Sequence, residues 1–516
     1  MSDSPGVGEV VRAVDQLDIS TSIGAILNRW PAVGLVVGVV YSGEPASFYS
    51  HGVADIASGT PVTEDTIFRI ASITKTITAL AVMQLWEQGL IDLDAPANDY
   101  LRAFRLTPAK PSWRPATVRQ LLTHTAGIGE VVRPWQAVQR DFGESFKIGR
   151  LPKLAQYYRG GIRLMAEPGT RFRYSDHGPA TLGQLVEDVS GEPLNRYFRE
   201  HIFGPLGMTD SDLVRSDAVK SRLATGYEVR SRRVKAVAER EMVTAGAGSV
   251  YSSPRDMCRY LAALLGGGAN EHGSVLRPAT LASMFEPHYQ PDPRLPGMGL
   301  AFWRTRLGDH LAVEHQGTLP GFHSQLYLAP DSGAGVVAFT NGSWQPDFWL
   351  PPECSGLLGQ LLGVPKAGSR RDVPQRPQIW RDICGWYALP GPLSDVRVRS
   401  MVGAGIEVFV RSGQLRLRFL TPIPALYRGF LLRPDDESDP YVFRVELSET
   451  VATRVVFAQE GGAGTALHLE IMPLSLRKQT AAMNPRLWAS GALGTFVTAG
   501  AASVLRRATR RSDGRV

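Results

Sequence analysis

Ser72 and Lys75 stand three residues apart in a segment that could perform nucleophilic chemistry. Positions i and i+3 of a helix lie on the same face, so the hydroxyl and the amine would be neighbours. A serine hydroxyl becomes a good nucleophile only when a base takes its proton, and a desolvated lysine with a lowered pKa can do this. Chance matches to this spacing are common, and by itself it also fits a helix-capping serine beside a surface lysine.

A predicted helix positions these two residues. Apolar side chains recur at helical spacing from Ile73 to Leu85, and Gly89 is typical of a helix end. Ser72 would lie at the N-terminus of this helix, where free backbone N–H groups and the positive end of the helix dipole face its oxygen. Upstream, the valine-rich run 32–41 and the segment 48–53 predict a β-hairpin, preceded by an amphipathic helix over 14–30.

The segment 68–75 (Phe-Arg-Ile-Ala-Ser-Ile-Thr-Lys) resembles the nucleophile segment of the serine β-lactamase and penicillin-binding-protein-like hydrolases. The resemblance is to the class C-like branch, which also contains esterases, D-aminopeptidases and DD-peptidases, and it covers roughly residues 20–345. It is carried in order by 52–55 (Gly-Val-Ala-Asp), 89–94 (Gly-Leu-Ile-Asp-Leu-Asp), 121–128 (Leu-Leu-Thr-His-Thr-Ala-Gly-Ile), 168–169 (Pro-Gly) and 204–208 (Gly-Pro-Leu-Gly-Met).

The resemblance implies a tyrosine and an asparagine on a loop of the helical part, and Tyr174-Ser175-Asp176 stands at that place. Tyr174 would work with Lys75 as general base toward Ser72 and later as acid toward the leaving group. Asp176 departs from the expected asparagine, because an ionised carboxylate only accepts hydrogen bonds whereas an amide also donates. Two roles for Asp176 are open: pairing with Lys75, or rejecting anionic substrates.

A third element is expected to be a Lys-Thr-Gly-like strand, and here the chain reads His315-Gln316-Gly317-Thr318. Gly317 would let a substrate approach the strand edge. By resemblance, the backbone N–H groups of Ser72 and Thr318 would form the oxyanion hole, and His315 would lie near Tyr174 and assist proton transfer or bind substrate. The missing lysine removes a fixed positive charge, which weakens the expectation of β-lactam or peptide-carboxylate recognition.

Two other histidines were weighed against these assignments. His124 is predicted to be a structural hydrogen-bonding residue rather than a catalyst. Asp309 and His310 offer a Ser-His-Asp triad with Ser72 as an alternative, but no G-x-S-x-G motif surrounds the serine. No P-loop motif and no H-E-x-x-H motif occurs, so the sequence predicts neither a cofactor nor a metal site.

The pattern of elements predicts an α+β fold in more than one domain. Residues 14–365 are expected to form the β-lactamase-like domain, an antiparallel sheet flanked by helices, with 92–240 mainly helical. A linker over 366–378 follows, then short strands over 379–475 that predict an antiparallel barrel or sandwich, lipocalin-like by resemblance, and a tail over 476–516.

The composition and the two ends of the sequence bear on the expected partners and location of the protein. The net charge of +7 comes from 56 basic and 49 acidic residues, a mild excess that predicts no nucleic-acid partner. The three cysteines lie far apart and are expected to be reduced and buried. The N-terminus lacks a signal-peptide pattern, which predicts a cytoplasmic protein. The charge-free run 487–505, followed by arginines, allows weak membrane contact or an ordinary packed helix.

These residues predict a serine hydrolase that acts through an acyl-enzyme on small-molecule carboxylic esters or small amides, with esterase-like activity preferred. One alternative is a D-amino-acid peptidase or DD-carboxypeptidase, or a weak β-lactamase. Another is a catalytically inactive binding or scaffold protein with the same fold. The sequence leaves the oligomeric state open.

Overall fold

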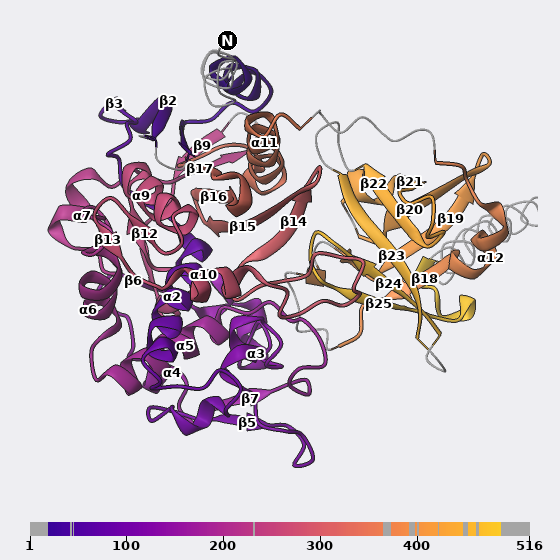
Figure 1. The fold of residues 1–516 in the computed structure, drawn as a ribbon, viewed down its shortest axis with the longest axis horizontal. Helices are drawn as coiled ribbons and strands as arrows, with labels where there is room; N and C mark the ends of the chain where they lie inside the picture. Colours follow the sequence, from indigo (N-terminus) through magenta and orange to yellow (C-terminus); the bar gives the residue numbers. More distant parts are fainter. Residues whose placement is uncertain are drawn as a thin grey trace, which may run out of the picture. The chain divides into compact units, whose positions relative to one another are not determined.

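The computed structural model describes residues 19–486 apart from 42–43, 45, 231–232, 365–372, 392–397, 400–401, 422, 447–451 and 461–463. The chain divides into two compact units, one made mainly of residues before 370 and one made mainly of residues from 370 onward. Figure 1 shows the first unit from indigo to orange and the second in orange and yellow. Each unit is described by itself.

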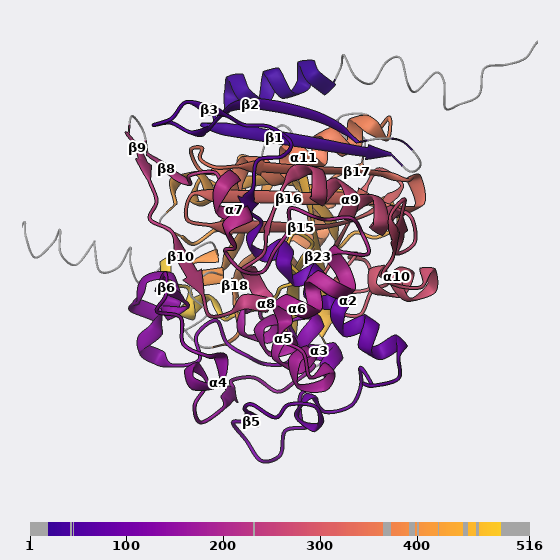
Figure 2. The same ribbon diagram turned by 90° about the vertical axis from the view of Figure 1, so that its left-hand side faces the viewer.

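A seven-stranded antiparallel sheet organises the first unit, in the order β14-β15-β16-β17-β1-β2-β3. Figure 2 shows β2, β1, β17, β16 and β15 one below another, with helices α2 to α6 gathered on the far side of β15. The hairpin and the later strands predicted from the sequence are confirmed. The strands are β1 (Gly34–Tyr41), β2 (Ser47–Asp55), β3 (Thr60–Pro61), β14 (Trp303–Leu307), β15 (His310–Leu319), β16 (Phe322–Ala329) and β17 (Ala334–Thr340).

Strand β1 is central because both of its faces are buried. Leu35, Val37 and Val39 pack in one core cluster with the helix over 19–29 and with α11 (Pro346–Leu361), whereas Val36 and Val40 pack in the cluster on the opposite face. This is the period-two alternation of a strand in which every position is apolar. The two clusters lie on opposite faces of one sheet, so the sheet is the middle layer of the unit.

Helix α2 (Thr74–Glu87) runs through the larger cluster and is buried from Thr74 to Leu85. It is the helix predicted from the spacing of its apolar residues, and Gly89 follows it with a left-handed φ of 70°. Helix α9 (Pro254–Leu265) packs beside it against the sheet. A serine followed by proline is typical of a helix start, and Ser253 caps α9 by accepting from Asp256 N, with Pro254 as the first helical residue.

The expectation of a mainly helical segment over 92–240 is only partly right. Apart from α5, which has 14 residues, its helices have four to six residues, and short paired strands lie between them. The helices are α3 (Val118–Leu122), α4 (Leu154–Tyr157), α5 (His177–Ser190), α6 (Leu194–Phe198) and α7 (Asp217–Arg222), followed by α8 (Ala245–Gly248) and α10 (Pro278–Phe285). The short strands are β4 (Phe68–Arg69), β5 (Leu106–Pro108), β6 (Ser145–Lys147), β7 (Ile162–Leu164), β8 (Tyr227–Arg230), β9 (Arg233–Ala236), β10 (Arg240–Met242), β11 (Tyr251–Ser252), β12 (Ala269–Asn270) and β13 (Gly273–Ser274).

The second unit contains a closed antiparallel barrel, β18 to β25. Closure pairs β18 with β25 and leaves no strand edge. The final strand, β25, reads Ser-Leu-Arg-Lys, and its single leucine carries little strand signal. The strands are β18 (Gly385–Ala388), β19 (Ile406–Arg411), β20 (Gln414–Phe419), β21 (Phe430–Pro434), β22 (Val442–Glu446), β23 (Ala452–Glu460), β24 (Gly464–Leu469) and β25 (Ser475–Lys478), with short helices α12 (Trp380–Ile383) and α14 (Pro424–Tyr427).

The three cysteines are free thiols, with Cys258 and Cys354 buried and Cys384 partly exposed. Among the residues that the structure describes, no helix has both the length and the apolar character needed to cross a membrane. The run 487–505 lies outside the described residues.

Candidate active site

Ser72 lies on a single helical turn, η1 (Ala71–Ile73), between β4 and α2. Ala71 has a φ of 49°, a left-handed conformation that costs an alanine about 1 kcal/mol or more. Neighbouring strands hold this turn in place, because Ser324 Oγ on β16 donates to the carbonyl of Ile70 at 2.8 Å and Ile70 N donates to Val250 at 3.0 Å. The sheet thus fixes the backbone on which the partly exposed Ser72 is presented.

Lys75 joins Ser72 to two other elements. Its Nζ donates to Ser72 Oγ at 2.8 Å, to Asp176 Oδ1 at 2.6 Å and to the carbonyl of Ala247 on α8 at 2.9 Å. The lysine side chain is fully buried and that of Asp176 is 10% exposed. These three acceptors match the three N–H donors of an ammonium group.

The charge of Lys75 is set by two opposing effects. Burial favours the neutral amine, but the negative charge of Asp176 and the Tyr174 oxygen more than offset it, so the pKa of Lys75 lies above its usual value. Lys75 is therefore a buried ammonium at neutral pH. The desolvated lysine with a lowered pKa that the sequence allowed as a base is therefore not found, because the close charged neighbour of Lys75 is the carboxylate of Asp176.

Tyr174 lies between this ammonium and an aromatic cluster. Lys75 Nζ is 5.1 Å from the centre of the Tyr174 ring, and the ring stacks on Trp303 of β14 at a centroid distance of 6.1 Å. His124 covers the ring as well, with its centroid 4.5 Å away. The sequence analysis did not identify Trp303 or the Ala247 carbonyl, since a single tryptophan and a backbone oxygen leave no recognisable motif.

His315 is almost completely buried, at 1% exposure. Its Nδ1 is 2.7 Å from the carbonyl of Gln316, which can only accept, so Nδ1 carries the proton and Nε2 has the lone pair. Nε2 is buried and has no hydrogen-bond partner within the part of the chain that the structure describes. Burial, followed by the charge of Lys75, lowers the pKa of His315 to about 3, so the ring is neutral at physiological pH.

Gly317 lets strand β15 approach the nucleophile turn. A Cβ at this position would collide with the carbonyl of Ile70 and with Ser324 Oγ. Strand β14 pairs with β15 from His310 to Glu314, and this pairing ends before Gly317 and Thr318. The exposed Thr318 follows, and its hydroxyl donates to Asp347 Oδ1 at 2.6 Å. The sequence analysis did not anticipate Asp347, the second residue of α11.

The two alternative histidines differ in their placement. His124 is buried against Tyr174, its Nδ1 accepts from Ser175 N at 3.4 Å, and burial together with Lys75 holds its pKa well below the usual value. His310 lies at the far end of β15, bonded to Ser332. Seven strand residues separate it from Gly317, roughly 24 Å at 3.4 Å per residue. The structure does not bring Asp309 and His310 to Ser72.

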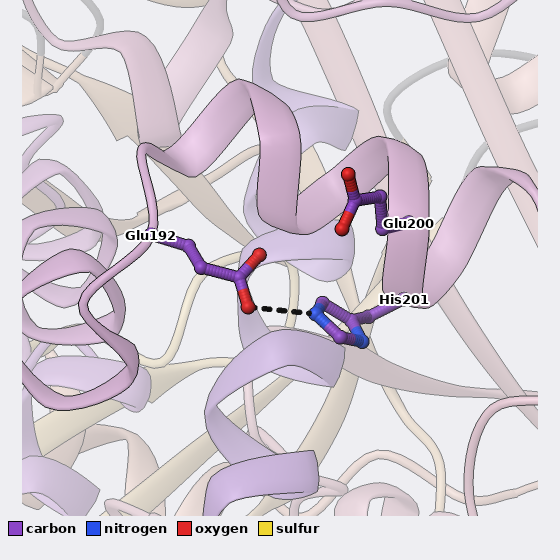
Figure 3. A group of neighbouring side chains, drawn as sticks. All are labelled: Glu192, Glu200 and His201. Carbon is purple, nitrogen blue, oxygen red and sulfur yellow. Dashed lines mark hydrogen bonds and ion pairs between the residues drawn. The ribbon is translucent and has the colours of Figure 1, made fainter.

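A separate group of potential metal ligands lies on the surface. Glu192, Glu200 and His201 place ligand atoms within 4.8 Å of one another (Figure 3). Arg196 contacts both carboxylates, at 2.8 Å for Glu200 and 3.9 Å for Glu192, and His201 is 3.3 Å from Glu192. A guanidinium already balances these charges, which fits a helix-surface ion-pair network.

Comparisons with known proteins agree with this geometry. The sequence profile of the Beta-lactamase family matches residues 25–348. The chain is 28% identical to Esterase EstB of Burkholderia gladioli over 373 residues, 64% of this chain and 93% of that protein. It is 27% identical to a Beta-lactamase of Yersinia enterocolitica over 356 residues, 63% of this chain and 86% of that protein.

Two solved structures extend the comparison. D-amino acid amidase from Ochrobactrum anthropi superposes with a TM-score of 0.54 at 25% identity, covering 67% of this chain and 98% of that one. An octameric penicillin-binding protein homologue from Pyrococcus abyssi gives a TM-score of 0.57 at 23% identity over 90% of this chain and all of the other, a likeness of fold. The matched family profile spans the sheet, Ser72, Lys75 and Thr318 alike, and the chain belongs to the Beta-lactamase family.

Proposed function

We propose that this protein is a serine hydrolase that cleaves carboxylic esters, and small amides less readily, through an acyl-enzyme on Ser72. The observation that carries the proposal is the 2.8 Å hydrogen bond from a fully buried Lys75 ammonium to the Ser72 oxygen. A buried cation at this position stabilises the negative charge that develops on the serine oxygen as its proton leaves.

Tyr174 is the proposed proton acceptor. Its ring lies 5.1 Å from the Lys75 ammonium, whereas the neutral His315 is a weak base because burial and the charge of Lys75 lower its pKa to about 3. In the first step the Ser72 proton passes to the Tyr174 oxygen while Ser72 Oγ bonds to the substrate carbonyl carbon. In the second step the bond to the leaving group breaks, and that group takes the proton from Tyr174. Water then hydrolyses the acyl-enzyme.

The oxyanion of the tetrahedral intermediate is assigned to the backbone N–H groups of Ser72 and Thr318. The close approach that Gly317 permits supports this assignment, because it brings β15 against the turn that carries Ser72. His315 Nε2 can accept a hydrogen bond from the Tyr174 hydroxyl or from a substrate N–H. Asp176 holds the ammonium in place.

Esters are preferred because a histidine stands where the family has a lysine, and because of the similarity to an esterase over 93% of that protein's length. Hydrolysis of D-amino-acid amides is the second candidate, supported by the similarity to D-amino acid amidase. A small set of p-nitrophenyl esters and D-amino-acid p-nitroanilides separates the two.

The proposal is tested by comparing wild type with Ser72→Ala on these substrates. Ser332→Ala is the matched control, since Ser332 is an exposed serine bonded to His310 at the far end of β15. We expect kcat/KM to fall at least about 1,000-fold in Ser72→Ala, because the nucleophile is lost, and to stay unchanged in the control. Equal activity of wild type and Ser72→Ala would contradict the proposal and favour a binding protein.

A further inference from the structure

Two carboxylates flank the Ser72 site. Asp176 contacts Lys75 on the buried side, and Asp347 contacts Thr318 on the exposed side, where its own side chain is 45% exposed. Asp176 stands where the motif of the resembled family has an asparagine, whereas Asp347 belongs to none of the motifs identified from the sequence. The position of Asp347 bears on which substrates can enter.

On the buried side, the positive charge of Lys75 and the negative charge of Asp176 offset each other. Lys75 and Asp176 form an ion pair at 2.6 Å, and the two neighbouring histidines, His124 and His315, are both neutral at physiological pH. The charged groups that shift the pKa of His315 are Lys75 and Asp176, which have opposite signs. Within the described residues, therefore, the buried side offers an incoming anion no net positive charge.

On the exposed side, the charged group in contact with Thr318 is the carboxylate of Asp347. A hydroxyl has a single O–H to donate, and that of Thr318 is used on Asp347. It has no proton left for a substrate anion. Since Thr318 N–H is an assigned oxyanion donor, the Asp347 carboxylate stands roughly 6 Å from the reacting carbonyl, one threonine side chain and one hydrogen bond away. The nearest cation candidate is His323, with Nε2 3.6 Å from Asp347.

We infer that Asp347 is a specificity-determining residue that directs the site toward carbonyl compounds with a neutral or positively charged group beside the scissile bond, and against those with a carboxylate there. This inference rests on the proposed function, because it concerns the substrate of the same Ser72 reaction. Asp347 acts through its charge and takes no part in bond making.

The test uses three p-nitrophenyl esters with acyl chains of similar length, namely the neutral pentanoate, the anionic hemiglutarate and the cationic 4-(trimethylammonio)butanoate. Wild type is expected to prefer the neutral and cationic esters. We expect Asp347→Asn to raise kcat/KM for the anionic ester relative to the cationic one by about fivefold, the size of a partly screened charge contact. Asparagine keeps the shape and can still accept from Thr318.

Two control variants separate charge from structure. Asp331→Asn makes the same change in charge in the turn at the far end of β16 and should leave the ratio unchanged. Asp347→Glu keeps the negative charge and should therefore rank the three esters by kcat/KM in the same order as wild type. The selectivity of wild type should also shrink between about 0.01 M and about 1 M salt, because the Debye length falls from about 30 Å to about 3 Å.

The outcomes are distinguishable from those of the proposed function. Suppose that wild type hydrolyses all three esters through Ser72, but that the ratio of kcat/KM for the anionic ester to that for the cationic ester is the same in Asp347→Asn and wild type at low salt. The inference is then overturned and the proposed function stands. The same holds if the anionic ester is the best substrate of wild type. If no ester is hydrolysed in a Ser72-dependent way, the proposed function fails and this inference fails with it.

Discussion

A nearly buried ion pair of the first unit can be compared with one of the second unit, and the two pairs differ in what they contact. In the first unit Lys75 and Asp176 are 0% and 10% exposed; in the barrel Arg418 and Glu407 are 10% and 12% exposed. Lys75 also donates to the Ser72 hydroxyl, whereas Arg418 donates through Nε to Glu407 at 2.7 Å and lies over the Phe409 ring.

The ion pair between Arg418 and Glu407 is explained by the pairing of two barrel strands. Glu407 and Arg418 face each other in register on β19 and β20, so the ion pair joins neighbouring strands, and an aromatic ring covers the guanidinium. No such pairing of neighbouring strands explains the Lys75 contacts, because the partners of Lys75 come from η1, from the residue just before α5 and from α8. A buried ion pair is thus evidence of chemistry only when a reactive group completes it, as Ser72 does here.

The largest expected effect comes from breaking the lysine pair. Lys75→Met should lower kcat/KM for esters about 1,000-fold, because the cation that stabilises the serine oxyanion is lost. It should also destabilise the first unit by about 3 kcal/mol, since Asp176 is left buried without its partner. Steady-state kinetics and thermal unfolding measure the two effects.

Arg418→Met is the matched variant in the barrel. It should cost a similar amount of stability, about 3 kcal/mol, but leave kcat/KM within about twofold of wild type, because among the described residues Arg418 contacts Glu407 and the rings of Phe409 and Tyr427. Comparable kinetic losses in both variants would remove the distinction between the two pairs.

A smaller effect is expected from Asp176→Asn. The carboxylate raises the pKa of Lys75, so its loss lets burial lower that pKa. If the ammonium is the active form, the alkaline limb of the kcat/KM profile should move to lower pH, with about a tenfold loss well above neutral pH. A Lys75 that acts as the neutral base would give the opposite result, with activity gained at low pH as its acid limb moved down.

Sequence patterns predicted those parts of the fold whose signal is local. Strand β1 was found because valine and leucine fill both of its faces, and α9 because Ser253 and Pro254 mark its start. Strands β18 and β21 carry a weaker sequence signal, since each is four or five residues long and only half buried. The parallel pairing of β5 with β7 joins Leu106 to Ile162, and no local pattern reveals such a contact.

In the candidate site, too, some residues could be predicted from sequence patterns and others could not. Ser72, Lys75 and Tyr174 were found through a family resemblance, and the structure places Lys75 against both of the others. The 2.6 Å contact of Asp176 agrees with one of the two roles left open for it. The Ala247 carbonyl, Trp303 and Asp347 could not be found, because each acts by where the fold places it rather than by its residue type.

The central claim is that Ser72 is the nucleophile, and mapping a covalent label tests it most directly. Wild-type protein treated with a fluorophosphonate should gain one adduct, located by peptide mass spectrometry on Ser72, and Ser72→Ala should gain none under the same conditions. Folded wild-type protein that stays unlabelled, or that carries its adduct on another residue, would contradict the account.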